Sequence, residues 1–135
     1  HSGGNENLGQ TGVLIMAQDH VRDRLIKGND STPPAPPAAL PVVTYHDGIK
    51  LHLNGDEIRV QHMKHAHTDG DSIVFWQKAN VVHMGDLFFN KVTLPFIDLS
   101  SGGNARGMLA AADKVLAMTR PGSFRATGRW RTRRT

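Results

Sequence analysis

The chain contains no cysteine among its 135 residues. It therefore forms no disulfide and supplies no thiolate for a zinc finger. The lack of cysteine is compatible with both an oxidising and a reducing compartment. Aromatic residues make up only 6% of the chain, so the core must be built mainly from aliphatic side chains. No apolar run approaches the roughly 20 residues that cross a bilayer. The length is sufficient for one domain with a modest core.

Acidic residues are missing from the C-terminal end of the chain. The net charge is +4, but six of the sixteen basic residues are arginines within residues 120–135, where there is no acid. Residues 1–119 carry ten basic and twelve acidic side chains, so the body of the chain is mildly acidic. A basic tail of this kind can bind nucleic acid or anionic lipid.

Apolar periodicity and turn residues predict alternating helices and strands. Helices are predicted over residues 3–10, 19–26 and 106–118, and strands over residues 13–17, 42–45, 49–53, 57–62, 72–77 and 80–84. The turn sequences HDG (46–48) and NGD (54–56) both predict hairpins, and the Pro-rich segment 28–41 predicts a surface loop. This order indicates an α/β layered fold with mixed or antiparallel pairing.

Two segments concentrate side chains that bind metals. The sequence HAHTDGD (65–71) leads into an apolar strand, and HMGD (83–86) ends the next predicted strand. Strands fix the backbone rigidly, so the loops at their ends can aim nitrogen and oxygen donors at one point. This arrangement favours a metal site over a set of unrelated surface histidines.

Together with the opening sequence HSGGNE (1–6), these segments resemble the metallo-β-lactamase superfamily of metal-dependent hydrolases. The resemblance implies that residues 1–122 form part of an αββα sandwich with mixed and antiparallel sheets. It also implies zinc chemistry, in which a metal-activated water attacks an ester, amide or similar bond of a small-molecule substrate. The intact family site holds two zinc ions.

The resemblance assigns roles to four residues. His1, His67 and Asp86 match family metal ligands, with Asp86 as the carboxylate that bridges two ions. Asp71 is a candidate for the carboxylate that accepts a hydrogen bond from a ligand histidine and orients it, and a turn-capping role for it is equally open. The other histidines match no ligand position, and we expect them to be structural or exposed.

Other family ligands have no counterpart in this sequence. No His-x-His-x-Asp motif precedes His1, and Pro121-Gly122 is followed by Ser123 rather than by the histidine of a Pro-Gly-His-Gly-Pro turn. We therefore expect partial zinc binding or none. The alternatives are a non-catalytic fragment that binds metal weakly, and a protein whose basic tail binds nucleic acid or membranes. The sequence is compatible with a periplasmic and with a cytoplasmic location, and it specifies no oligomeric state.

The basic tail, residues 123–135, has an interpretation that needs no partner. One permitted, GC-rich codon choice for residues 124–130 encodes Pro-Gly-His-Gly-Pro-Val in another reading frame, at about the expected distance beyond the last helix. We interpret the tail as out-of-frame sequence without ordered structure, and we expect no specific nucleic-acid partner.

Brief trypsin treatment should remove the tail and leave the melting temperature of the remaining chain nearly unchanged, because an arginine-rich segment buries too little apolar surface to become ordered. Any binding of nucleic acid should be non-specific and should weaken steeply with added salt. Sequence-selective binding that resists salt would contradict this interpretation, as would a large loss of stability on trimming.

Overall fold

The computed structural model describes residues 2–89, 94–118 and 125–127, the last three as backbone only. The chain divides into two compact units, His1–Asp47 and Gly48–Thr135. The sequence predicted one domain over residues 1–122, and most of both units lies within this range. Each unit is described by itself below.

The first unit combines short helices with one pair of parallel strands. Its elements are α1 (Asn5–Gln10), β1 (Met16–Gln18), α2 (Asp19–Lys27), the 3-10 turn η1 (Pro37–Ala39) and β2 (Val43–Tyr45). The fully buried Gln18 begins α2, because its side chain accepts a hydrogen bond of 2.6 Å from the His20 N–H. Gln18 also donates to the His46 carbonyl at 3.3 Å, so one buried amide joins α2 to the chain after β2.

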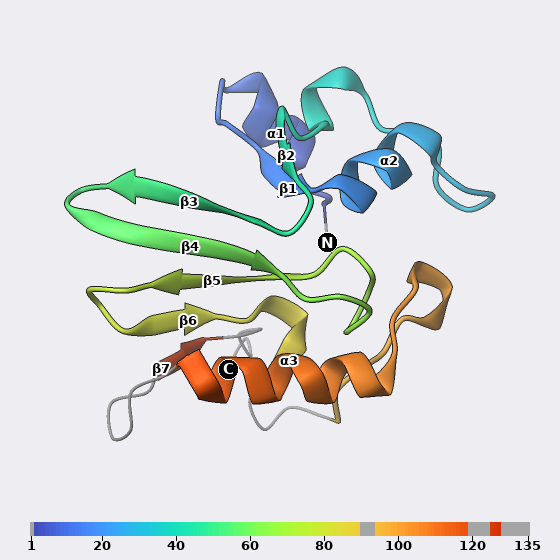
Figure 1. Ribbon diagram of the computed structural model, residues 1–135. Helices are drawn as coiled ribbons and strands as arrows, with labels where there is room; N and C mark the ends of the chain where they lie inside the picture. The colour runs from blue at the N-terminus through green and yellow to red at the C-terminus, as the bar shows by residue number, and fades with distance from the viewer. Residues whose placement is uncertain (1, 90–93, 119–124, 128–135) are drawn as a thin grey trace, which may run out of the picture. The chain divides into compact units, whose positions relative to one another are not determined.

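The second unit is a five-stranded sheet with one long helix (Figure 1). The strands, in the order in which they lie side by side, are β3 (Gly48–Leu53), β4 (Asp56–His62), β5 (Ser72–Trp76), β6 (Val81–His83) and β7 (Arg125–Thr127). Neighbouring strands are antiparallel, except that β6 and β7 are parallel. The remaining elements are the 3-10 turns η2 (Gly85–Leu87) and η3 (Leu99–Ser101) and the helix α3 (Ala105–Met118). This mixture of parallel and antiparallel pairing confirms the predicted fold class.

Of the two predicted hairpin turns, one forms. Asn54 and Gly55 have φ angles of 53° and 71° and join β3 to β4, as expected for an Asn-Gly turn between antiparallel strands. The prediction for HDG (46–48) is wrong. The preceding strand β2 pairs with β1, so the segment 46–47 connects two different sheets.

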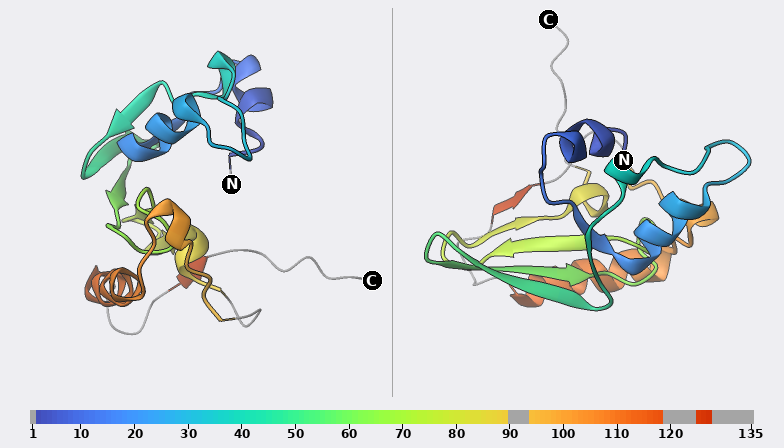
Figure 2. Two further views of the ribbon diagram at one scale, coloured as in Figure 1. Left: turned by 90° about the vertical axis from the view of Figure 1, so that its right-hand side faces the viewer. Right: turned by 90° about the horizontal axis from the view of Figure 1, so that it is seen from above.

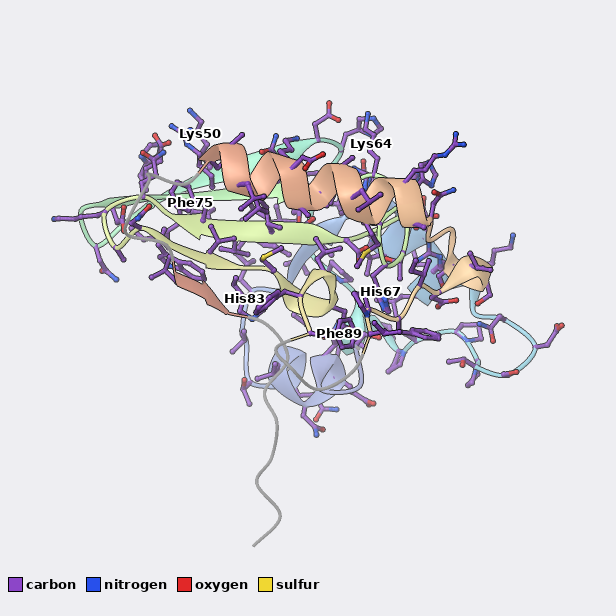
Figure 3. The ribbon with its side chains drawn as sticks, turned by 90° about the horizontal axis from the view of Figure 1, so that it is seen from below. Lys50, Lys64, His67, Phe75, His83 and Phe89 are labelled. Carbon is purple, nitrogen blue, oxygen red and sulfur yellow. The ribbon has the colours of Figure 1, made fainter. Side chains whose placement is uncertain are left out.

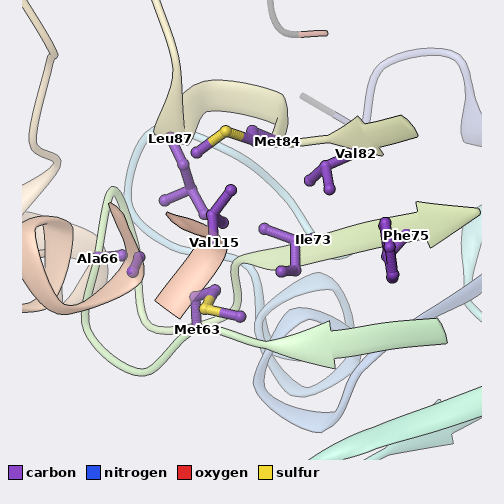
Figure 4. Packing of buried hydrophobic residues seen from close by; sticks show 9 residues of the cluster. Met63, Ala66, Ile73, Phe75, Val82, Met84, Leu87 and Val115 are labelled. Carbon is purple, nitrogen blue, oxygen red and sulfur yellow. The ribbon is translucent and has the colours of Figure 1, made fainter. Parts of the chain in front are cut away.

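The core of the second unit lies between α3 and one face of the sheet. Ile73, Phe75 and Val82 alternate on this face, with Phe75 directly opposite Val82 in the β5–β6 register. Figure 4 shows Val115 of α3 packed among these residues and Met63. Because successive side chains of a strand point to opposite faces of the sheet, every second residue lies on the same face. These residues form the apolar surface against which α3 packs.

Helix α3 runs roughly along the direction of the strands (Figures 1 and 2). Its buried residues are Ala111 and Val115, with Met108 and Met118 packed against the core. The other large apolar residues of this helix, Leu109 and Leu116, are exposed. Only one side of the helix therefore packs against the sheet.

Part of the predicted unordered tail is in regular structure. Residues 125–127 form β7, which extends the sheet beside β6, while residues 123–124 and 128–135 lie outside the described residues. Within the part of the chain that the structure describes, no helix is long and apolar enough to cross a membrane.

Replacement of Ile73 by alanine should lower the free energy of unfolding by about 2–5 kcal/mol, because it leaves a cavity in the centre of this core. Leu109→Ala is the matched control on the exposed side of α3, and it should change stability by less than about 0.5 kcal/mol. Urea denaturation followed by circular dichroism measures both. Equal losses in the two variants would contradict the packing described here.

Candidate metal centre

Two of the predicted ligands lie together at one end of the five-stranded sheet. His67 lies in the loop between β4 and β5 (Figure 3). Asp86 lies in η2, which follows β6. Atom Nε2 of His67 is 3.7 Å from Oδ2 of Asp86, and the two side chains are only 5% and 13% exposed. The third predicted ligand, His1, lies outside the described residues.

The Phe96 main chain determines the tautomer of His67. Atom Nδ1 of His67 is 2.8 Å from the Phe96 carbonyl oxygen. A carbonyl oxygen only accepts hydrogen bonds, so Nδ1 must carry the proton and Nε2 of the neutral ring must carry the lone pair. The Phe96 ring also packs against the imidazole, with centroids 5.7 Å apart and planes tilted by 58°. One residue therefore holds the ring of His67 through both its carbonyl group and its side chain.

The resulting arrangement places a lone pair next to a carboxylate in a mostly buried setting. Two electron-rich atoms at this distance repel each other unless a proton or a cation lies between them. Histidines that bind metals commonly donate their other ring N–H to a main-chain carbonyl, as His67 does to Phe96. Imidazole nitrogen and carboxylate oxygen are suitable donors for zinc and for iron. The pair is therefore chemically suited to ligate a metal ion.

The described residues do not bring together a complete set of metal ligands. Among them, no group of three His, Cys, Asp or Glu side chains is close enough to hold one ion. A catalytic zinc ion has about three protein ligands. His67 and Asp86 would supply two of these ligands, and the ligand roles of His67, Asp86 and His1 all stay predictions.

Asp71 has the geometry of a turn cap. Its carboxylate accepts hydrogen bonds from the Thr68 backbone N–H at 2.7 Å and from the Thr68 hydroxyl at 3.0 Å. The same hydroxyl accepts from the Gly70 N–H at 3.1 Å, which closes the turn. Burial raises the pKa of Asp71 above its usual value, and the hydrogen bonds from Thr68 oppose that shift. The group that accepts the Nδ1 proton of His67 is the Phe96 carbonyl, so these contacts favour the turn-capping alternative for Asp71.

The neighbouring histidines have structural contacts. Nε2 of the buried His62 is 2.8 Å from the Asp69 carbonyl oxygen. This contact connects the end of β4 to the loop that carries His67. His65 has a left-handed backbone conformation, with φ of 51°, and its Nδ1 lies 3.1 Å from the Gly102 carbonyl oxygen. From the sequence, these two histidines were expected to be structural or exposed, without defined partners.

Sequence reasoning also missed the segment 96–104. Asp98 begins η3, and its carboxylate accepts hydrogen bonds from the Ser100 hydroxyl at 2.5 Å and the Ser101 N–H at 3.2 Å. These bonds, the one from Ser100 first, lower the pKa of Asp98 to about 2. The spacing Asp-x-x-Ser before two glycines is typical of a capped turn, so a signal was present. It indicated a turn but not the partner of that turn.

Comparison with known proteins supports the family suggested by the motifs. The family model described as the metallo-beta-lactamase superfamily matches residues 2–120. No curated protein sequence matches the chain significantly.

Several solved structures share the fold. A metallo-beta-lactamase from Pontibacter korlensis has a TM-score of 0.72 and 14% identity, over 93% of this chain and 54% of that one. The protein TTHA1623, solved in a di-iron-bound form, has a TM-score of 0.66 and 18% identity, over 95% and 63%. A metallo-beta-lactamase family protein from Thermus thermophilus has a TM-score of 0.62 and 20% identity, over 93% and 50%. The chain thus spans about half to two thirds of the length of these structures.

Asp71→Ala should lower the free energy of unfolding by about 1–3 kcal/mol, because the partly buried Thr68 N–H loses its acceptor. Asp71→Asn retains one carbonyl oxygen and should cost clearly less. Urea denaturation of both variants at pH 7 measures the difference. If the alanine variant is as stable as the original chain, the turn-capping role is wrong.

Proposed function

Because this chain belongs to the metallo-β-lactamase superfamily, we propose that it carries part of the metal centre of a metal-dependent hydrolase, with His67 and Asp86 as two of the ligands. The observation that carries this proposal is the distance of 3.7 Å between His67 Nε2 and Asp86 Oδ2. At the same time, His67 Nδ1 is hydrogen-bonded to the Phe96 carbonyl. The contact between His67 and Asp86 joins two of the three motifs that suggested the family, although the two lie on different elements.

When a divalent metal is bound, it supplies a Lewis acid and lowers the pKa of its water ligand. The residues of the chain would hold the donor atoms in position. The Phe96 carbonyl keeps the proton on Nδ1 of His67, so Nε2 can donate its lone pair. The carboxylate of Asp86 would supply an oxygen donor next to Nε2 of His67.

Zinc is the metal that we propose, because histidine and carboxylate are common zinc ligands. The di-iron form of TTHA1623 indicates that this fold can also hold iron. We therefore include ferrous iron as the competing outcome of the titration below.

We further propose that the chain by itself binds metal weakly and hydrolyses esters or lactams only at the background rate. Its described residues offer two ligands rather than three, and it spans about half of the P. korlensis structure. A bound ion would then keep several water ligands, and the affinity should be low.

Calorimetric titration with zinc alone, and with ferrous iron under anaerobic conditions, tests the ligand assignment. His67→Ala and Asp86→Asn should each weaken zinc binding on the order of 100-fold, since even loss of a residue that only supports a ligand costs roughly 10–100-fold. His52→Ala and Asp113→Asn, at exposed positions on β3 and α3, are matched controls and should leave the affinity unchanged. Equal affinity in all variants would refute the site, and tighter binding of iron would replace zinc as its metal.

Hydrolysis of a chromogenic ester and a chromogenic lactam, with zinc present, tests the activity. The chain should stay at the background rate, and so should Asp86→Asn. Activity of the unchanged chain that disappears in His67→Ala and Asp86→Asn would show that the chain carries a working centre that needs these two residues. The proposal of a weak, partial site would then be wrong.

A further inference from the structure

The loop that carries His67 is fastened to the segment before α3 by three main-chain hydrogen bonds. The His67 carbonyl accepts from the Asp98 N–H at 2.9 Å, and the Ala66 carbonyl accepts from the Asn104 N–H at 2.9 Å. The Asp69 N–H donates to the Ser101 carbonyl, also at 2.9 Å. Main-chain atoms on both sides of His67 in the sequence are therefore held by one segment.

The holding segment is itself a closed turn whose shape depends on Asp98. The Asp98 carbonyl accepts from the Gly103 N–H at 2.8 Å and from the Ser101 N–H at 3.2 Å. Its carboxylate accepts from the Ser100 hydroxyl and from the Ser101 N–H. Asp98 thus closes its own turn through its carbonyl and its carboxylate, while its backbone N–H reaches across to His67.

Close packing leaves little freedom between the two segments. A Cβ atom at Gly103 would collide with the carbonyl oxygens of both His67 and Asp98. A Cβ atom at Gly107, in the first turns of α3, would collide in the same way with the His65 carbonyl oxygen. Glycine is needed at both positions because the ligand loop lies directly against the turn and the helix.

From this geometry we infer that Asp98 is a positioning residue for His67: by shaping the turn 98–103, it fixes the location and the tautomer of the imidazole. The link to the tautomer is the Phe96 carbonyl, which lies two residues before Asp98 on the same segment and accepts the Nδ1 proton. The value of this positioning for metal binding rests on the function proposed above, whereas the positioning itself does not.

Nitrogen-15 NMR of the imidazole rings in the metal-free chain tests the inference directly. In the original chain at pH 8, His67 should show one well-defined Nδ1–H tautomer. Asp98→Ala should loosen the turn, so the two ring nitrogens should shift towards averaged values. Asp98→Asn retains an acceptor oxygen and should restore the original spectrum. Asp56→Ala is the matched control, because Asp56 also caps a turn, accepting from the Lys78 N–H at 2.9 Å at the opposite end of β4.

Zinc titration provides the second measurement. Asp98→Ala should weaken zinc binding about tenfold, the lower range for loss of a residue that supports a ligand, and Asp98→Asn should recover most of the affinity. Gly103→Ala should weaken binding at least as much, because the new methyl group pushes on the His67 carbonyl. Leu109→Ala, on the exposed side of α3, is its control and should leave the affinity unchanged.

The two proposals fail in different ways. If the original chain binds no zinc, the proposed function is wrong, and the ring spectra of Asp98→Ala still decide the positioning role. If the His67 spectrum of Asp98→Ala equals that of the original chain, or if Asp98→Asn behaves as Asp98→Ala does, the positioning role is wrong whatever the zinc titration gives.

Discussion

The hydrogen bond from His67 Nδ1 to the Phe96 carbonyl is the contact on which the candidate centre depends. It decides which nitrogen carries the lone pair, and hence which atom faces Asp86. A neutral imidazole in solution exchanges its proton between both nitrogens, so a ligand histidine needs an acceptor that holds one tautomer. A main-chain carbonyl meets this need without titrating, and its position follows from the backbone that surrounds it.

That backbone is held by the core of the second unit. Ile73 and Val82 pack against Val115, and this packing places α3 along β5 and β6. The segment before α3 then reaches the loop after β4, where glycine allows close contact. The chemistry at one end of the sheet is thus connected to aliphatic packing along its face. A mutation in the core can therefore disturb the candidate centre without touching His67 or Asp86.

Local sequence signals predicted most of the elements of the fold. Apolar alternation found β4 and β5 almost to the residue, and Asn54-Gly55 was correctly assigned to a hairpin because its positive φ angles suit that turn. The segment 46–48 carried a similar signal and formed no hairpin. A turn signal reports local backbone preference, whereas the pairing of β2 with β1 depends on residues nearly 30 positions earlier in the chain.

The candidate centre also combines features that are local in the sequence with features that depend on the tertiary structure. The sequence alone singled out His67 and Asp86 as candidate ligands, because the short motifs that contain them resemble those of the family, and a short motif can be recognised without knowledge of the fold. Their role as ligands stays a prediction. The tertiary structure decided the tautomer of His67, the turn-capping contacts of Asp71 and the part played by Asp98. Each of these depends on which carbonyl or N–H group arrives opposite another. The contacts between the loop at 66–69 and the turn at 98–104 join residues about 30 positions apart, and no pattern within either segment specifies its partner.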